Sequence, residues 1–272
     1  MNEQELLGMQ AAEFAMAATL QSRAFWLQVA SVVVGTFAAG VPSSEFGFGA
    51  ALLAVALAIL WKWLDHRQRG SRTQAERARR ATLLITGLGD SISASEIVDL
   101  MAHFTVKAED GVRCQDSTYF ATKQTPGDLR LLEMLDESAF WSRHLVRECS
   151  KLAWRDCGMF LIAGFGAIAA AVAFGDPSQT QHVVQLVCLP LVFLMSNEVA
   201  GSAFAYEKAS SGLQRFLPRL DAARVAGIPR ADLLMLLMDY NSIVETTPLF
   251  RGGVYAANKD RLNDLWKQRP NL

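Results

Sequence analysis

The chain has 272 residues, which is enough for one or two ordinary domains. Hydrophobic residues make up 51% of the chain and charged residues 19%, compared with about 25% charged residues in a typical soluble domain. The net charge of −1 gives no overall electrostatic bias toward nucleic acid or acidic substrates, so no nucleic-acid partner is expected.

The N-terminal segment, 1–23, is expected to be a cytoplasmic helix. Its opening "MNEQELLGMQ" is acidic where a secretory signal carries positive charge, so no cleavable targeting peptide is expected. The four cysteines form neither a CxxC pair nor a cluster at zinc spacing, and we interpret them as ordinary thiols in a reducing compartment. No metal and no cofactor are expected.

Four uncharged apolar segments follow as two pairs. They cover 24–44, 46–61 (extended past Lys62 to 64), 157–175 and 177–197. A helix that crosses a bilayer needs about 20 apolar residues, and four such segments in pairs are not typical of a soluble core. The sequence therefore predicts an all-α membrane protein with four transmembrane helices in two hairpins, over 24–64 and 157–199.

The distribution of lysine and arginine predicts the orientation of these spans. Residues 62–80 contain seven of them and residues 143–155 contain four, whereas the turns 41–45 and 176–182 contain none. By the positive-inside rule, both termini and the central region are cytoplasmic.

The spans themselves carry small residues and almost no charge. A row at four-residue spacing in the third span lets helices approach closely, and it consists of Ala163, Ala167, Ala171 and Gly175. We expect this row to pack within the four-helix unit, with an interface between copies as the alternative. Pro190 in the fourth span is a candidate hinge, because it removes a backbone hydrogen bond. The scarcity of ionisable residues disfavours a proton-coupled transporter.

Residues 65–156 form a cytoplasmic insert that is expected to be mainly helical. Ser93 and Glu96 have the spacing of a capping box at a helix start. The stretch 104–125, centred on Gly111, permits a small β-hairpin. Asp128 follows "TPG" and predicts the start of a long helix.

The helix predicted over 128–156 has two distinct faces. One is a heptad seam of small and medium residues, at alternating spacings of three and four: Leu132, Leu135, Ala139, Ser142, Val146, Cys149 and Ala153. The other face carries acids, bases, Phe140 and Trp141, and we expect it to be solvated or to face a partner. We interpret 128–156 as a coupling helix continuous with the third span. Its contact residues toward the C-terminal tail or a second subunit are Glu137, Phe140, Trp141 and Arg143.

No enzyme signature is found. The "GLG" at 87–89 lacks the strand–helix setting of a dinucleotide loop, and no HExxH, DxD or nucleophile elbow occurs, so no catalytic residue is assigned. The tail, 200–272, is expected to be helical, with Pro229 opening a helix whose apolar run is too short to cross a membrane. This tail is the natural cover for Phe140 and Trp141.

The layout of an N-terminal helix, hairpin, insert, hairpin and helical tail ending in "LFRGGVYAANKDRLNDLW" resembles the SMODS-associating four-transmembrane (S-4TM) effectors. It is similar more loosely to the two-span SLATT effectors. The segment "YFAT…ESAFWSRHL" before the third span carries part of the resemblance, whereas "LLGMQAAEFAMAATLQSRAFW" lacks the Gln-Arg…Tyr…Lys pattern of that family.

The resemblance implies a pore-forming effector of bacterial anti-phage defence. Such a protein assembles as a homo-oligomer in the inner membrane and permeabilises it when triggered by a cyclic nucleotide or a nucleotidyltransferase-linked signal. The alternatives from other classes are a non-conducting membrane scaffold or signalling protein, and a small-molecule transporter.

Overall fold

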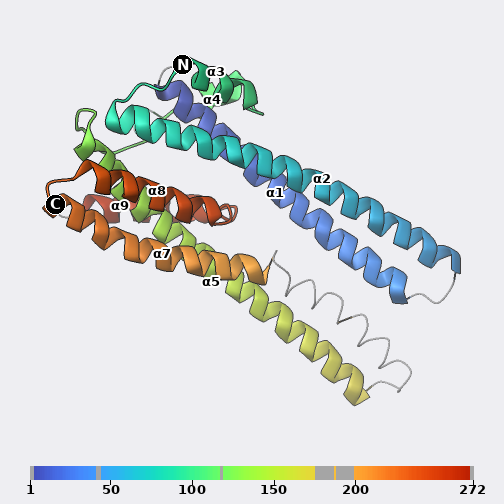
Figure 1. Ribbon diagram of the computed structural model, residues 1–272. Coiled ribbons are helices and arrows are strands. Elements are labelled where there is room, and N and C mark those ends of the chain that lie inside the picture. Colours follow the sequence, from blue (N-terminus) through green and yellow to red (C-terminus); the bar gives the residue numbers. More distant parts are fainter. Residues whose placement is uncertain (1–2, 41–43, 117–118, 175–186, 188–198, 270–272) are drawn as a thin grey trace. The chain divides into compact units, whose positions relative to one another are not determined.

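The computed structural model describes all residues except 1–2, 41–43, 117–118, 175–186, 188–198 and 270–272 (Figure 1). The described residues form helices and no strand, which confirms the predicted all-α class. The helices are α1 Glu3–Gly40, α2 Ser44–Thr82, the π-helical turn η1 Leu83–Leu88, α3 Ala94–His103, α4 Ala108–Arg113, α5 Asp128–Phe174, α7 Ala200–Val225, α8 Arg230–Thr246 and α9 Val254–Lys267.

The chain divides into two compact units. Unit 1 comprises Met1–Ala18, Gln68–Cys149 and Ala205–Leu272, and unit 2 comprises Thr19–Arg67 and Ser150–Phe204. Four helices, α1, α2, α5 and α7, contribute residues to both units. The predicted domain borders at 23, 64, 156 and 199 lie a few residues from the points where these helices change unit.

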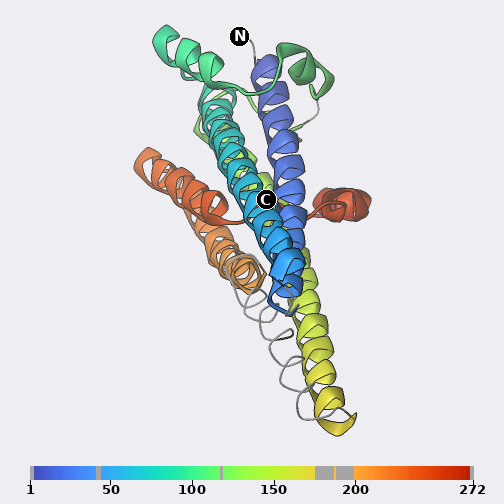
Figure 2. The same ribbon diagram turned by 90° about the vertical axis from the view of Figure 1, so that its right-hand side faces the viewer.

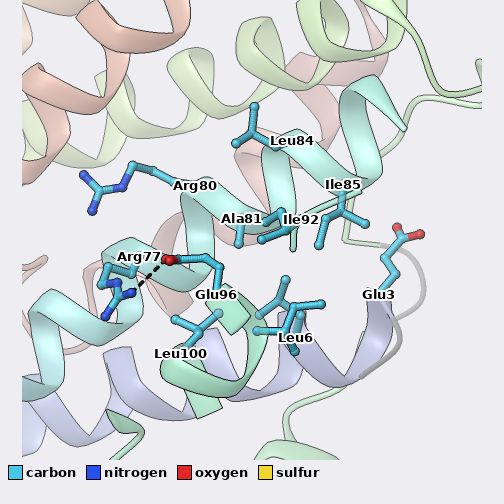
Figure 3. Close-up of a pocket in the computed structure, with 11 residues that line it drawn as sticks. Glu3, Leu6, Arg77, Arg80, Ala81, Leu84, Ile85, Ile92, Glu96 and Leu100 are labelled. Atoms are coloured by element: carbon cyan, nitrogen blue, oxygen red, sulfur yellow. Dashed lines mark hydrogen bonds and ion pairs between the residues drawn. The ribbon is translucent and has the colours of Figure 1, made fainter. Parts of the chain in front are cut away.

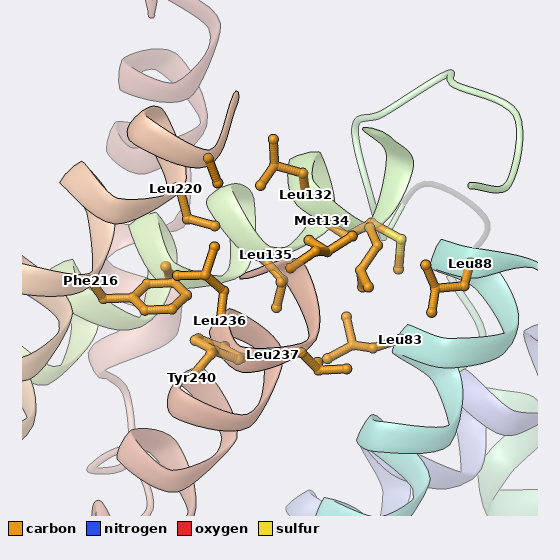
Figure 4. Packing of buried hydrophobic residues seen from close by; sticks show 14 of the residues in the cluster. Leu83, Leu88, Leu132, Met134, Leu135, Phe216, Leu220, Leu236, Leu237 and Tyr240 are labelled. Atoms are coloured by element: carbon orange, nitrogen blue, oxygen red, sulfur yellow. The ribbon is translucent and has the colours of Figure 1, made fainter. Parts of the chain in front are cut away.

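The main core of unit 1 lies where α5, α7, α8 and η1 meet (Figure 4). Leu132, Leu135 and Ala139 of the predicted seam on α5 are fully buried there. The other buried members include Leu83, Leu213, Phe216, Leu220, Leu233, Leu236 and Tyr240. Burial of each large side chain contributes roughly 1.5–3 kcal/mol, so this cluster is the main source of stability of the unit.

Local sequence signals set several helix ends in unit 1. The Ser93 side chain caps α3 by accepting a hydrogen bond of 3.3 Å from the Glu96 amide, as the capping box predicts. α5 begins at Asp128, and Pro229 precedes α8. At Gly87 an added Cβ would lie 2.9 Å from the Leu131 side chain, so only glycine lets η1 pack this closely on α5.

The hairpin predicted within 104–125 is wrong, because the structure has the short helix α4 there and no strand among the described residues of the stretch. Two glycines explain the difference. Gly111 of α4 and Gly8 of α1 approach so closely that neither position has room for a Cβ. The close packing against α1 favours a helical turn, which the Lys107 amide and the Asp110 carboxylate close at its N-terminus.

In unit 2, the second half of α1 and the first half of α2 lie side by side (Figures 1 and 2). The Ser31 hydroxyl donates a 2.9 Å hydrogen bond to the Ala54 carbonyl, and an added Cβ at Gly35 would lie 3.7 Å from the Ala54 side chain. Leu20, Ala24 and Leu64 form a small buried cluster between the same helices. Small residues thus bring the backbones of α1 and α2 close together.

Among the described residues, two helices are long and apolar enough to cross a membrane, and they are α2 and α5, which carry the second and third predicted spans. The first predicted span lies on α1, which is described up to Gly40. The fourth span, Gly175 and the candidate hinge Pro190 lie outside the described residues. Ala163, Ala167 and Ala171 lie on α5, and Ala163 is exposed among the described residues.

The apolar segments of α2 and α5 are not the buried core of unit 2. Only 6% and 12% of their most apolar windows are buried within the described structure. Large exposed apolar side chains include Phe46, Phe48, Leu52, Val55, Ile59, Phe160, Ile162, Phe165 and Val172. An exposed apolar surface of this size is typical of contact with membrane or partner, and the apolar segment of each helix is long enough to cross a bilayer.

Candidate functional site

Helix α9 covers the two aromatic residues of the predicted coupling helix. The Phe140 ring is buried, with its centroid 5.2 Å from that of Trp266 and 4.6 Å from that of His144. The Trp141 ring lies 5.9 Å from Tyr255, at the start of α9. These contacts place the C-terminal tail on the face of α5 that carries Phe140 and Trp141.

The acids beside these aromatics are buried rather than solvated, unlike the solvated surface that the sequence permits. Asp136 accepts a 2.9 Å hydrogen bond from Arg269 and lies 3.7 Å from Arg224. Glu137 accepts a 2.9 Å hydrogen bond from the Ala121 amide. Burial, together with the charge of Asp136, raises the pKa of Glu137, and the Ala121 amide opposes this shift. Both acids therefore hold segments of unit 1 together.

Arg143, the fourth predicted contact residue, is half-buried on the same helix. Its positive charge acts on the neighbouring His144. Burial lowers the pKa of His144, and the positive charges of Arg143, Arg261 and Arg147 lower it further. The imidazole beside Phe140 therefore stays neutral over a wider pH range than a solvated histidine.

A second set of contacts, which the sequence did not suggest, surrounds the loop 247–253 between α8 and α9. We call this segment the α8–α9 loop. The Arg72 guanidinium of α2 donates hydrogen bonds to the carbonyls of Val244, Glu245 and Thr247, at 3.3 Å and 2.9 Å for the first two. The Val244 carbonyl also accepts a 3.2 Å hydrogen bond from the Thr247 amide. Carbonyls at the end of a helix lack donors from a following turn, so Arg72 supplies further donors there and its positive charge is favourable at this helix end.

Two further helices hold the same loop. The Tyr206 hydroxyl of α7 donates a 2.6 Å hydrogen bond to the Leu249 carbonyl. The Arg251 amide donates to the Cys149 thiol of α5, with 3.4 Å between nitrogen and sulfur. Burial raises the pKa of both Tyr206 and Cys149, so both remain protonated at neutral pH.

These three residues share a place in the chain. Arg72 lies one turn after Gln68, Tyr206 follows Ala205, and Cys149 is the last α5 residue of unit 1. Each therefore lies next to the point where its helix changes from one unit to the other. The α8–α9 loop is tied to three of the four helices that both units share.

A buried ion network on α2 supports Arg72. Glu76 lies 3.9 Å from Arg72 and 2.8 Å from Arg79, and Arg79 lies 3.7 Å from Glu245 of α8. Burial raises the pKa of Glu76, while the charges of Arg79 and Arg72 oppose this shift. Removal of one partner from such a buried pair leaves an uncompensated charge, so the network fixes the side-chain positions around the loop.

The sequence contains only an indirect signal for this site. Arg72 and Arg79 belong to the basic run that the positive-inside rule already explains, so their residue type alone indicates no specific partner. Glu76 four residues after Arg72 is a visible i,i+4 pair. Tyr206 and Leu249 are 43 residues apart, and no local pattern predicts their hydrogen bond.

Aromatic and cationic residues lie together at several positions in unit 2. On α2, Lys62 lies 4.7 Å over the Trp61 ring and Arg67 lies 5.1 Å over the Trp63 ring. Trp154 of α5 and Phe204 of α7 make an edge-to-face contact of 4.8 Å. Tryptophan with lysine or arginine is typical of the level of the lipid headgroups.

Within the described residues, no group of three or more histidine, cysteine, aspartate or glutamate side chains is placed to hold a metal ion. Comparisons of the chain with protein-family models, curated proteins and solved structures give no match.

Proposed function

We propose that this protein is a membrane effector that permeabilises the bacterial inner membrane when a cytoplasmic event loosens the α8–α9 loop. The observation that carries the proposal is the binding of one loop by Arg72, Tyr206 and Cys149, which belong to three helices shared by both units. A change at the loop therefore acts on all three helices at once.

Support for the membrane comes from unit 2. Its exposed apolar side chains would be costly in water, and the tryptophans beside Lys62 and Arg67 suit a headgroup layer. From Phe46 to Trp63, α2 has 18 residues and a length of about 26 Å at the usual helical rise, which is close to the thickness of a hydrocarbon core. The basic residues of 62–80 support an orientation in which unit 1 and both termini are cytoplasmic.

The resting state in this proposal is the one with the loop bound. Arg72 then satisfies carbonyl groups at the end of α8, and the loop limits movement of α2, α5 and α7. A trigger shifts the protein to an open state only if it binds that state more tightly. The resemblance noted above suggests a cyclic nucleotide or a nucleotidyltransferase-linked signal as the trigger, and a homo-oligomer as the conducting form.

A non-conducting membrane scaffold is the second candidate, and one observation favours it. Leu234, Met235 and Met238 form an exposed apolar patch on α8 in unit 1. Such a patch outside the membrane is typical of a surface that binds another protein.

Dye release from liposomes separates the two candidates. Purified protein is reconstituted into liposomes with a trapped dye, with and without candidate cyclic nucleotides. Arg72→Met removes the guanidinium hydrogen bonds and is expected to loosen the loop without a trigger. Thr73→Met is the matched control, because Thr73 is the exposed neighbour of Arg72 on α2. An effector releases dye with Arg72→Met and not with Thr73→Met. Complete insertion without release from either variant would favour the scaffold.

A further inference from the structure

Unit 1 contains a cavity that the proposed function does not use. It has a volume of about 310 Å³ and lies where α1, α2 and α3 meet (Figure 3). Known ligand pockets have volumes of roughly 300–1,000 Å³ and are mostly apolar, with a few polar groups at defined positions. The cavity is therefore at the small end of the range for a ligand site.

The interior of the cavity is aliphatic. Its walls include Leu6 of α1, Ala81 of α2, Leu84 and Ile85 of η1, Ile92, and Ile97 and Leu100 of α3. Figure 3 shows the side chains of Ala81, Ile85, Ile92 and Leu6 directed toward one another. No aromatic ring is among the lining residues, so a purine or other planar base finds no stacking partner.

The charged residues at the rim are already paired. Arg77 bonds to Glu96 at 2.8 Å, Arg80 bonds to Glu245 at 3.0 Å, and Glu3 lies 3.9 Å from Arg130. Two bases and two acids line the rim, so the local charge is balanced. A charged ligand would have to break one of these ion pairs, and its own charge would then lie close to the displaced residue of the same sign.

We propose that this cavity binds a small uncharged molecule with an aliphatic body and one polar end, such as a medium-chain alcohol, amide or ester. The aliphatic body fills the space between Leu6 and Ile85, where apolar surface is removed from water. The polar end lies at the rim, where Arg77 and Glu96 offer hydrogen-bond donors and acceptors. The proposal concerns binding alone and does not require that the protein permeabilises membranes.

A photoactivatable probe tests the proposal on the full chain in detergent micelles. A diazirine derivative of octanol is photolysed with the protein, and modified residues are located by mass spectrometry. Unlabelled 1-octanol competes at a specific site, whereas non-specific partition into the apolar surface of unit 2 does not saturate. We expect saturable labelling within 81–100 and non-saturable labelling on the apolar segments of α2 and α5.

Two variants and one control complete the test. Ala81→Leu and Ile85→Phe fill the cavity from different positions, and each is expected to lower saturable labelling at least about tenfold. Ala222→Leu adds the same methylenes on the exposed face of α7 and should leave the labelling unchanged. Absence of saturable labelling in the folded wild type would overturn the proposal. So would saturable labelling of both filled variants at the level of the wild type.

The charge class of the ligand is tested by competition. Octanoate and octylammonium have the same aliphatic body as 1-octanol with a negative or positive end. Because the rim charges are paired, each ion should compete at least about tenfold less well than 1-octanol. Equal competition by either ion would show that the site accepts charge and would contradict the assignment to uncharged ligands.

Discussion

The Tyr206 hydroxyl on α7 donates a 2.6 Å hydrogen bond to the Leu249 carbonyl, 43 residues further along the chain. Tyr206 is almost completely buried and lies at the start of the α7 segment that belongs to unit 1. With Arg72 of α2 and Cys149 of α5, it binds the α8–α9 loop to three helices. A loop held from three directions restricts the relative movement of those helices.

The seam of α5 predicts the effect of overpacking. Ala139 is fully buried in the core of unit 1, so Ala139→Leu should lower the free energy of unfolding by about 1–3 kcal/mol. Ala222→Leu makes the same change on an exposed position of α7 and should be nearly neutral. Chemical denaturation in detergent measures both. An equal effect of the two variants would show that Ala139 is not in a packed core.

The aromatic contacts between α5 and α9 predict that removal of Phe140 and Trp141 loosens the docking of α9 on α5. α9 itself buries only Val254 and Leu262 completely, so its docking depends strongly on Phe140 and Trp141. In Phe140→Ala/Trp141→Ala, hydrogen exchange of the α9 amides should rise at least about tenfold. Leu265→Ala, an exposed α9 position, is the control. Unchanged exchange in the double variant would mean that α9 is held by other contacts.

The same double variant tests the role of α5 in cells. If the covered face of α5 transmits the trigger, Phe140→Ala/Trp141→Ala should uncouple triggering from dye uptake while membrane insertion remains intact. Dye uptake is measured under the triggering condition at matched membrane levels. Equal uptake by wild type and variant would remove the coupling role from Phe140 and Trp141.

The buried Glu137 predicts a pH dependence. Burial raises its pKa above the ordinary value of 4.5, so the folded protein keeps a proton that the unfolded chain has already released. The contribution of Glu137 to stability is therefore lost as pH rises from about 4.5 through the folded pKa. Glu137→Gln does not titrate, and its carbonyl oxygen can still accept the Ala121 hydrogen bond.

We therefore expect the melting temperature of Glu137→Gln relative to wild type to be higher at about pH 8 than at about pH 5. Thermal unfolding at the two pH values measures this difference. Glu109→Gln, an exposed α4 position, controls for the lost charge. The opposite trend would mean that the folded structure favours the ionised carboxylate.

Orientation in the membrane gives a prediction that depends on sequence alone. Reporter fusions at residue 272 and within 176–182 should report the cytoplasmic and the outer side respectively, because 62–80 is basic and 176–182 contains no lysine or arginine. Alkaline phosphatase and green fluorescent protein fusions measure the two sides. A cytoplasmic signal from 176–182 would contradict the predicted topology.

Local patterns predicted much of the fold. The spacing of Leu132, Leu135 and Ala139 indicated the buried face of α5, and Ser93 indicated the start of α3. The stretch around Gly111 was misread, because its conformation depends on close packing against Gly8, about 100 residues away. Tertiary contacts of this kind override local propensity and leave no periodic trace.

The candidate site was less predictable than the fold. Phe140 and Trp141 stood out as aromatics on a charged face, and the contacts with Trp266 and Tyr255 explain them. Arg72 did not stand out, because its partners are backbone carbonyls, which every residue has. Only the fold shows which carbonyls at the end of α8 lie within reach of the Arg72 guanidinium.

Basal dye release from liposomes that contain Tyr206→Phe tests the central claim most directly. The variant removes one hydroxyl, leaves the Leu249 carbonyl without its donor and costs about 1 kcal/mol, which changes an equilibrium about fivefold. Tyr255→Phe, at an exposed position on α9, is the matched control. If the α8–α9 loop holds the resting state, Tyr206→Phe raises release without a trigger by about fivefold and Tyr255→Phe leaves it unchanged. Release that is equal in wild type and both variants, at equal insertion, would contradict control of the membrane unit by this loop.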